Sequence, residues 1–127
     1  MKLKHLEATE KGAMDYDLEN DILFLKVAGR TYARSVELDD IVVDLDQEGA
    51  VIGVQVFDVS ALFALDKAVL QHVQQWQFSV KIEQNVITIQ IFLEFHANGK
   101  VVERMQNLVR ESPLASENSE VVCALMV

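Results

Sequence analysis

Five carboxylic acids lie close together in the chain and form its densest set of side chains that could do chemistry. They are Glu37, Asp39, Asp40, Asp44 and Asp46. Carboxylates that meet at one point can bind Mg²⁺ or Ca²⁺, or act as a general acid and base. Neighbouring residues of a strand, however, point to opposite faces, so this spacing sends the side chains apart. The pattern predicts a solvated acidic edge that could bind a protein, rather than a metal or catalytic site.

The segment from Asp44 to Gly49 is similar to the start of a calcium-binding loop, with acidic side chains at alternate positions and glycine in sixth place. The twelfth position is Gln55, which cannot supply the bidentate carboxylate that such a loop needs. We therefore interpret the segment as a hairpin turn with solvated carboxylates, in which Gly49 adopts a positive φ.

Other residue types used in catalysis form no recognisable motif. His5, His72 and His96 share no metal-ligand spacing, and the sequence has neither a nucleophile elbow nor a phosphate-binding glycine loop. The single cysteine, Cys123, stands among apolar residues and is expected to be a small buried hydrophobe. We therefore expect no catalytic, cofactor-binding or metal-binding residue.

Composition restricts the kind of partner. The chain has 127 residues, half of them apolar, which suits one domain with its own core. Its 20 acidic and 11 basic residues give a net charge of −9, and the basic residues are scattered. Nucleic-acid binding is not expected, because it needs clustered cations. Without a signal peptide or a long apolar span, the sequence predicts a cytoplasmic protein with no membrane partner.

The first half of the chain alternates in the manner of β-strands. Apolar residues predict strands over 22–27, 31–38 and 41–46, with a return strand that carries Ile52, Val54 and Val56 on one face. Gly53, inside that return strand, indicates a bulge or a close backbone approach. Residues 1–15 are expected to form an irregular lead-in or a short edge strand.

The period changes after residue 60. Leu62, Leu65, Val69 and Val73 recur at three- and four-residue steps, which predicts one amphipathic helix over about residues 60–74. Asp58 or Ser60 could cap its first turn. The apolar stripe of this helix is expected to cover one face of the sheet.

The second half returns to strand periodicity. Strands are predicted over 76–83 and 87–95, and Asn98-Gly99 is typical of a tight hairpin. Residues 100–109 fit either a strand, which we favour, or a helix. Residues 112–120 are expected to form a loop, and the apolar tail 120–127 an edge strand or part of a subunit interface.

Part of the chain is similar to a known family. The residues concerned are Tyr16-Asp17, Asp21, Leu23, Ser35-Val36-Glu37-Leu38, Val43-Asp44-Leu45-Asp46, Gly49, Val51-Ile52-Gly53 and Phe57-Asp58. Over roughly residues 15–60 this pattern resembles the prokaryotic proteins grouped as domain of unknown function 2283. The resemblance implies a compact β-meander and no established activity.

Together these features predict a single α+β domain over residues 1–127. It would consist mainly of antiparallel β-meanders with one amphipathic helix on the sheet: a family-like meander at 16–60, the helix at 61–75 and a second β-rich part at 76–127. The expected function is a non-enzymatic protein–protein interaction module, antitoxin-like or immunity-like. It would be homo-oligomeric through its second half, with the acidic residues free for a basic protein. The alternative is a small ligand-binding or enzymatic domain with a carboxylate-lined pocket between subunits, completed by Tyr16 or Tyr32.

Overall fold

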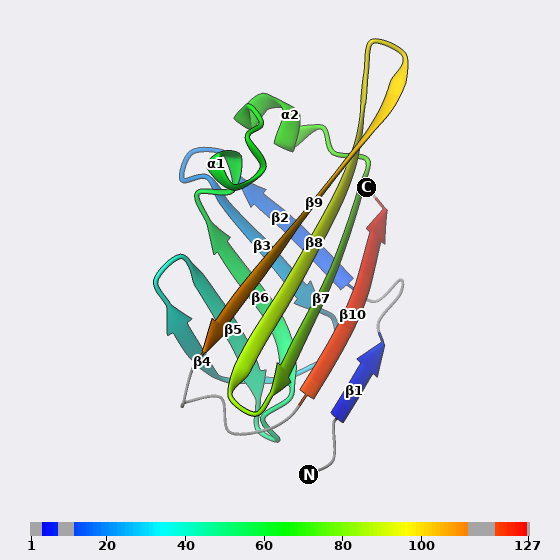
Figure 1. Cartoon of the computed structure of the whole chain (residues 1–127). Helices are drawn as coiled ribbons and strands as arrows, with labels where there is room; N and C mark the ends of the chain where they lie inside the picture. Colours follow the sequence, from blue (N-terminus) through cyan, green and yellow to red (C-terminus); the bar gives the residue numbers. More distant parts are fainter. Residues whose placement is uncertain (1–3, 8–11, 112–118, 127) are drawn as a thin grey trace.

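Two five-stranded sheets stack face to face in the computed structural model, which describes residues 4–7, 12–111 and 119–126 (Figure 1). Sheet A contains, in spatial order, β1 (Lys4–Glu7), β10 (Ser119–Met126), β7 (Gln75–Glu83), β8 (Val86–Ala97) and β9 (Lys100–Glu111). Sheet B contains, in spatial order, β2 (Gly12–Asp17), β3 (Ile22–Val27), β6 (Val51–Phe57), β5 (Ile41–Asp46) and β4 (Tyr32–Leu38). The strands of the two sheets cross at a steep angle in Figure 1.

The core lies between the sheets and follows directly from strand alternation. In β7, Trp76, Phe78, Val80 and Ile82 are buried, while the residues between them are exposed or half-buried. In β8, every second residue from Ile87 to Phe95 is buried in the same way. Burial of apolar surface is worth about 25 cal/mol per Å², so these alternating faces are the main source of stability.

The predicted α+β fold with one helix over 60–74 is wrong. The chain is mainly β, and this segment contains two short helices, α1 (Val59–Phe63) and α2 (Lys67–Gln71). Ala64 is left-handed, with φ 54°, and ends α1, while Asp66 is extended and begins α2. The apolar stripe therefore never forms one continuous face. Sheet B, rather than a helix, covers sheet A, and the helices lie at one end of the sandwich (Figure 1).

The predicted strands agree with the structure more closely than the predicted helix does. The strands β3 and β5 have the predicted bounds, and β7 and β8 extend the predicted segments by one to two residues. Residues 100–109 belong to strand β9, as favoured. Asn98 and Gly99 both have positive φ, 53° and 75°, as the tight hairpin requires.

The first and last described strands belong to the sheets. In the lead-in, β1 and β2 are edge strands of the two sheets, which agrees with one of the two expectations. The tail is not an edge strand, because β10 lies between β1 and β7. The loop expected at 112–120 falls largely outside the described residues, as does the side chain of Cys123. No helix among the described residues is long and apolar enough to cross a membrane.

Gly53 has both of the features expected of it. Gly53 pairs with Asp44, and the register of β5 with β6 shifts directly beside it, because Leu45 pairs with Val51 and Ile52 is skipped. A Cβ atom at Gly53 would lie 2.9 Å from the carbonyl oxygen of Leu25, closer than real Cβ atoms come. The missing side chain therefore lets β3 and β6 approach beside Asp44.

Candidate functional site

A buried carboxylate, Asp21, joins the loop after β2 to the start of α1. Its oxygens accept hydrogen bonds from Tyr16 Oη at 2.6 Å, from Ser60 Oγ at 2.6 Å and from the Ser60 amide at 3.1 Å. Asp21 therefore caps the start of α1, a role that the sequence suggested for Asp58 or Ser60. Asp58 itself makes no capping bond. This cluster positions the helix and presents no free carboxylate to a ligand.

Two pKa values reflect this cluster. Burial alone would raise the pKa of Asp21, but hydrogen bonds from Ser60 and Tyr16 outweigh it and hold the pKa below its usual range. Burial, the hydrogen bond to Asp21 and the charge of that carboxylate raise the pKa of Tyr16 above its ordinary value. The pair is therefore stable as a neutral phenol beside an ionised carboxylate.

A second polar network lies on the outer face of sheet B. Ser35 Oγ donates to Asp44 Oδ1 at 2.7 Å, and Tyr32 Oη lies 2.8 Å from Ser35 Oγ. The side-chain amide of Gln55 lies 3.5 Å from both Asp44 oxygens. Asp44 does point away from the core as predicted, yet it is only 8% exposed because its neighbours on β4 and β6 cover it.

Asp46 serves the hairpin between β5 and β6. Its Oδ1 accepts hydrogen bonds from the backbone amides of Glu48 and Ala50 at 2.9 and 3.0 Å. Arg30 lies 3.9 Å from its other oxygen, across a shallow hollow of about 200 Å³. The hairpin interpretation of this segment is therefore confirmed, although Asp46 itself is buried rather than solvated.

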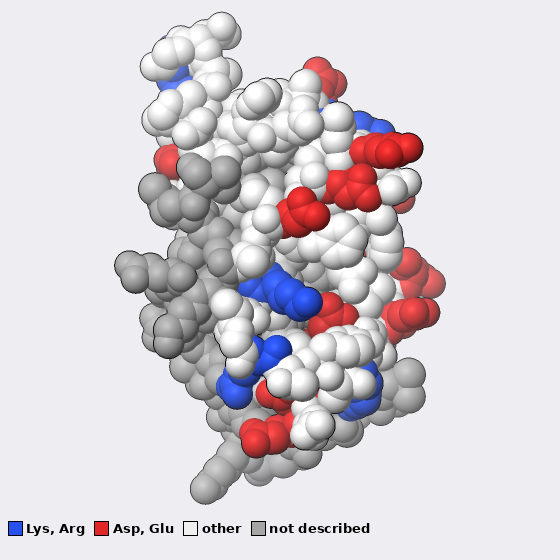
Figure 2. All heavy atoms as spheres, turned by 180° about the vertical axis from the view of Figure 1, so that it is seen from behind, with Lys and Arg blue, Asp and Glu red and all other residues white. Residues whose placement is uncertain are grey.

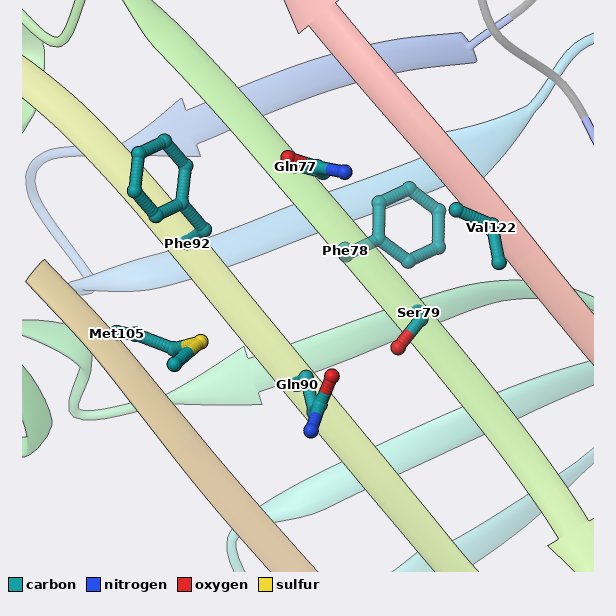
Figure 3. A pocket seen from close by; sticks show the side chains of 7 residues that line it. All are labelled: Gln77, Phe78, Ser79, Gln90, Phe92, Met105 and Val122. Atoms are coloured by element: carbon teal, nitrogen blue, oxygen red, sulfur yellow. The ribbon is translucent and has the colours of Figure 1, made fainter.

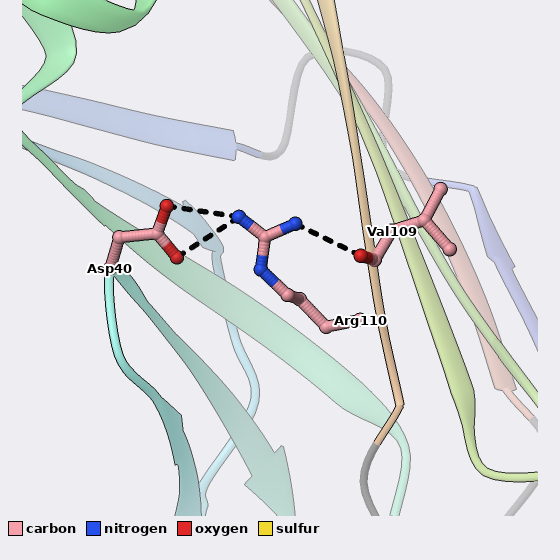
Figure 4. Close-up of polar contacts among 3 residues, drawn as sticks. All are labelled: Asp40, Val109 and Arg110. Carbon is pink, nitrogen blue, oxygen red and sulfur yellow. Dashed lines mark hydrogen bonds and ion pairs between the residues drawn. The ribbon is translucent and has the colours of Figure 1, made fainter.

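Asp40, at the turn between β4 and β5, faces the other sheet. Arg110 Nη2 of β9 donates to both of its carboxylate oxygens, at 2.9 and 3.2 Å (Figure 4). Glu37 and Asp39 are exposed. Of the five residues predicted as one surface, Asp44 and Asp46 are buried and Asp40 is paired with Arg110.

The face of the molecule seen from behind in Figure 2 carries charges of both signs. Acidic side chains are spread over that face, and basic side chains lie among them (Figure 2). Within the described ranges no group of three or more His, Cys, Asp or Glu side chains is arranged to hold a metal ion.

The two tyrosines that the sequence suggested for a carboxylate-lined pocket lie in different clusters. Tyr32 is linked to Asp44 through the hydroxyl of Ser35. Tyr16 donates a hydrogen bond to Asp21 instead.

Two of the histidines come together although the sequence separates them. His72 and His96 line a mostly apolar hollow of about 270 Å³ with Val69 and Phe95, where α2 meets the end of β8. They come together because α2 and the end of β8 line the same hollow. No spacing rule in the sequence could have found this pair.

The most distinctive surface lies on β9, an edge strand that the sequence did not single out as a site. Val101, Met105 and Val109 are 56%, 59% and 56% exposed, and alternate with the residues that face sheet B. Met105 is opposite Phe92 on the outer face of β8. We call this strip, Val101, Met105 and Val109 with Phe92, the β9 strip.

The β9 strip continues into a shallow hollow of about 160 Å³ on the outer face of sheet A (Figure 3). Its lining comprises Gln77, Phe78, Ser79, Gln90, Phe92, Met105 and Val122. Phe92, Met105 and Val122 contribute apolar side chains to this hollow. Gln77, Gln90 and Ser79 contribute polar groups that carry no charge. Uncharged, partly apolar surface of this kind suits contact with another protein.

The sandwich and its exposed edge define the chain as a two-sheet β protein, and comparison with known proteins places it among relatives. Residues 13–60 match the family described as "Protein of unknown function (DUF2283)". An uncharacterised protein of Methanocaldococcus jannaschii is 31% identical over 110 residues, which cover 86% of this chain and 90% of that protein. The chain belongs to this family of unknown function, and the matched segment contains nearly all of sheet B.

A further relative carries a functional name. A protein of Methanosarcina mazei named putative hypoxanthine phosphoribosyltransferase is 24% identical over 90 residues, covering 71% of this chain and 73% of that protein. No solved structure matches the chain.

Proposed function

We propose that this protein is a non-enzymatic protein-association module that binds through the edge of β9. The observation that carries the proposal is the β9 strip, in which three large apolar side chains are more than half exposed on a strand that has no second neighbour in the sheet among the described residues. An edge strand offers backbone donors and acceptors to another strand, and alternate apolar side chains add specificity.

The polar clusters support the same proposal, because their carboxylates are already hydrogen-bonded to groups of the fold. Asp21 holds the start of α1, Asp46 closes a hairpin, and Asp44 is covered by Ser35 and Gln55. Each carboxylate satisfies neighbouring donors of the fold. A carboxylate used as an acid, base or metal ligand would instead point into a cleft that a substrate can enter.

The acidic edge becomes the secondary surface of this proposal. Glu37 and Asp39 are exposed on it, and a basic protein could meet them through charge attraction. We place the main contact on β9, because exposed apolar area contributes more to stable association than two solvated charges do.

Two matched variants test which surface matters. Met105→Lys puts a charge at the centre of the β9 strip, and Glu37→Lys reverses a charge on the acidic edge. Light scattering over a concentration series should show that the unaltered protein and Glu37→Lys associate alike, whereas Met105→Lys associates at least tenfold more weakly. The reverse order would move the interface to the acidic edge and overturn the proposal.

The name of the M. mazei relative supplies a second candidate, a small-molecule site for a purine base. The hollow beside His72 and His96 is the place we would assign to it, because it is apolar and carries two imidazoles. Thermal unfolding with and without hypoxanthine tests this assignment, since a ligand that binds the folded state raises its melting temperature. An unchanged melting temperature at millimolar hypoxanthine would remove it.

A further inference from the structure

We infer that β9 pairs antiparallel with β9 of a second copy of this chain, with Met105 opposite Met105 of the second copy. The two A sheets would then join into one continuous sheet across a two-fold axis. This inference rests on the proposed function and adds its partner and register. It follows from which backbone groups of β9 point away from β8 and from how its side chains would be matched.

The edge of β9 that faces away from β8 is formed by its odd-numbered residues. Arg104 and Arg110 each donate from Nη1 to the backbone oxygen of the preceding residue, Glu103 and Val109, at 2.9 Å. Those two carbonyl groups therefore point away from β8, the strand with which β9 pairs. Because the direction of the backbone groups alternates along an antiparallel strand, residues 101, 103, 105, 107 and 109 all present their N–H and C=O groups outward.

Pairing about Met105 matches side chains of like kind on both faces. On the outer face, Val101 would lie opposite Val109, and Glu103 opposite Asn107. On the inner face, Val102 would lie opposite Leu108, and Arg104 opposite Gln106. No two like charges oppose each other over residues 101–109, and the apolar residues of the β9 strip form one ladder across the two copies. Lys100 would face Arg110 at each end, where Arg110 is already neutralised by Asp40.

Neighbouring registers are less well matched. An axis at Glu103 sets Glu103 against itself, and an axis at Arg104 sets Arg104 against itself. An axis at Gln106 puts Val101 and Val109 opposite glutamates. An axis at Asn107 puts Glu103 opposite Glu111. Like charges directly opposed destabilise strand pairs, so the register about Met105 is preferred.

The arginine contacts are compatible with both the single chain and the pair of chains. In the single chain, Arg104 and Arg110 satisfy the carbonyl oxygens of Glu103 and Val109. In the pair, the amides of Asn107 and Val101 of the second copy would take over those two acceptors. Arg110 can release Val109 and still hold Asp40, because the two contacts use different nitrogens.

Cysteine crosslinking tests the register, in a chain whose native Cys123 is replaced by alanine. Met105→Cys places two thiols across the axis, where opposed Cα atoms of a hydrogen-bonded pair are about 5.5 Å apart, within disulfide range. Val101→Cys is the control, because the two copies of residue 101 would be eight residues, or roughly 27 Å, apart. A mixture of Val101→Cys and Val109→Cys restores an opposed pair.

The expected result is rapid disulfide formation by Met105→Cys alone and by the mixture, and little by Val101→Cys alone. Light scattering on the same samples, with reductant, separates the two proposals. A chain that associates by mass but does not crosslink at residue 105 overturns this register and leaves association standing. A chain whose mass stays at 14.3 kDa at every concentration overturns both.

Discussion

Arg110 of β9 holds Asp40 of the β4–β5 turn through two hydrogen bonds of 2.9 and 3.2 Å, and so ties the edge of sheet A to the end of sheet B (Figure 4). Seventy positions separate the two residues. The contact fixes one end of the β9 strip on the sandwich. It also pairs Asp40, one of the five carboxylates of the predicted acidic edge, with a cation.

This ion pair should contribute little to stability, because both side chains are partly exposed to solvent. Replacing Asp40 by asparagine should lower the free energy of unfolding by less than about 1 kcal/mol. The loss should shrink further in high salt. Urea unfolding of Asp40→Asn beside Asp39→Asn, an exposed neighbour, measures it. A loss of several kcal/mol would mean that the pair is structurally essential.

Asp21 should matter more, since it is 7% exposed and accepts hydrogen bonds from Tyr16 and Ser60. Asp21→Asn removes the charge and turns an amide toward these donors, which should cost about 2 kcal/mol. Asp58→Asn is a matched control, because Asp58 is also left-handed but makes no capping bond. It should change stability by less than about 0.5 kcal/mol.

The effect of Asp21 should depend on pH in a defined direction. Its folded-state pKa lies below the unfolded value, so its contribution is present above about pH 4 and is lost as the pH falls further. The difference in unfolding free energy between the unaltered protein and Asp21→Asn should therefore disappear in acid. A difference that stays constant down to pH 2 would contradict this.

Tyr16 should act at the other end of the scale. Its folded-state pKa is raised, so its contribution is complete below the unfolded phenol pKa of about 10 and is lost as the pH rises above that value. Stability of the unaltered protein should fall from about pH 10 upward, and Tyr16→Phe should fall less steeply. Thermal unfolding between pH 8 and 11 distinguishes the two. Parallel curves would show that Tyr16 does not titrate with unfolding.

The periodicity of the sequence was sufficient to predict the strands, but not to predict which elements pack against each other. Trp76 to Ile82 alternate strictly, so β7 could be predicted from its own residues. The stripe from Leu62 to Val73 also has a real helical period, but Ala64 and Asp66 break it at a point that propensity does not reveal. That sheet B rather than a helix covers sheet A depends on contacts between distant strands.

The same limit applies to the candidate site. The alternation of β5 predicts that Asp44 faces solvent. Ser35 of β4 and Gln55 of β6 nevertheless cover its carboxylate. Ser60 meets Asp21 across 39 positions, so the cap of α1 could not be read locally. The β9 strip was visible as apolar residues, but only the sheet order shows that β9 is an edge.

Amide hydrogen exchange along β9, followed residue by residue at increasing protein concentration, tests the central claim most directly. The amides of Arg104 and Gln106 face β8 in either state and should exchange slowly throughout. The account predicts that the amides of Glu103, Met105 and Asn107 exchange fast in dilute protein and at least tenfold more slowly once the copies associate. Equally fast exchange of these three amides at every concentration would contradict association through the edge of β9.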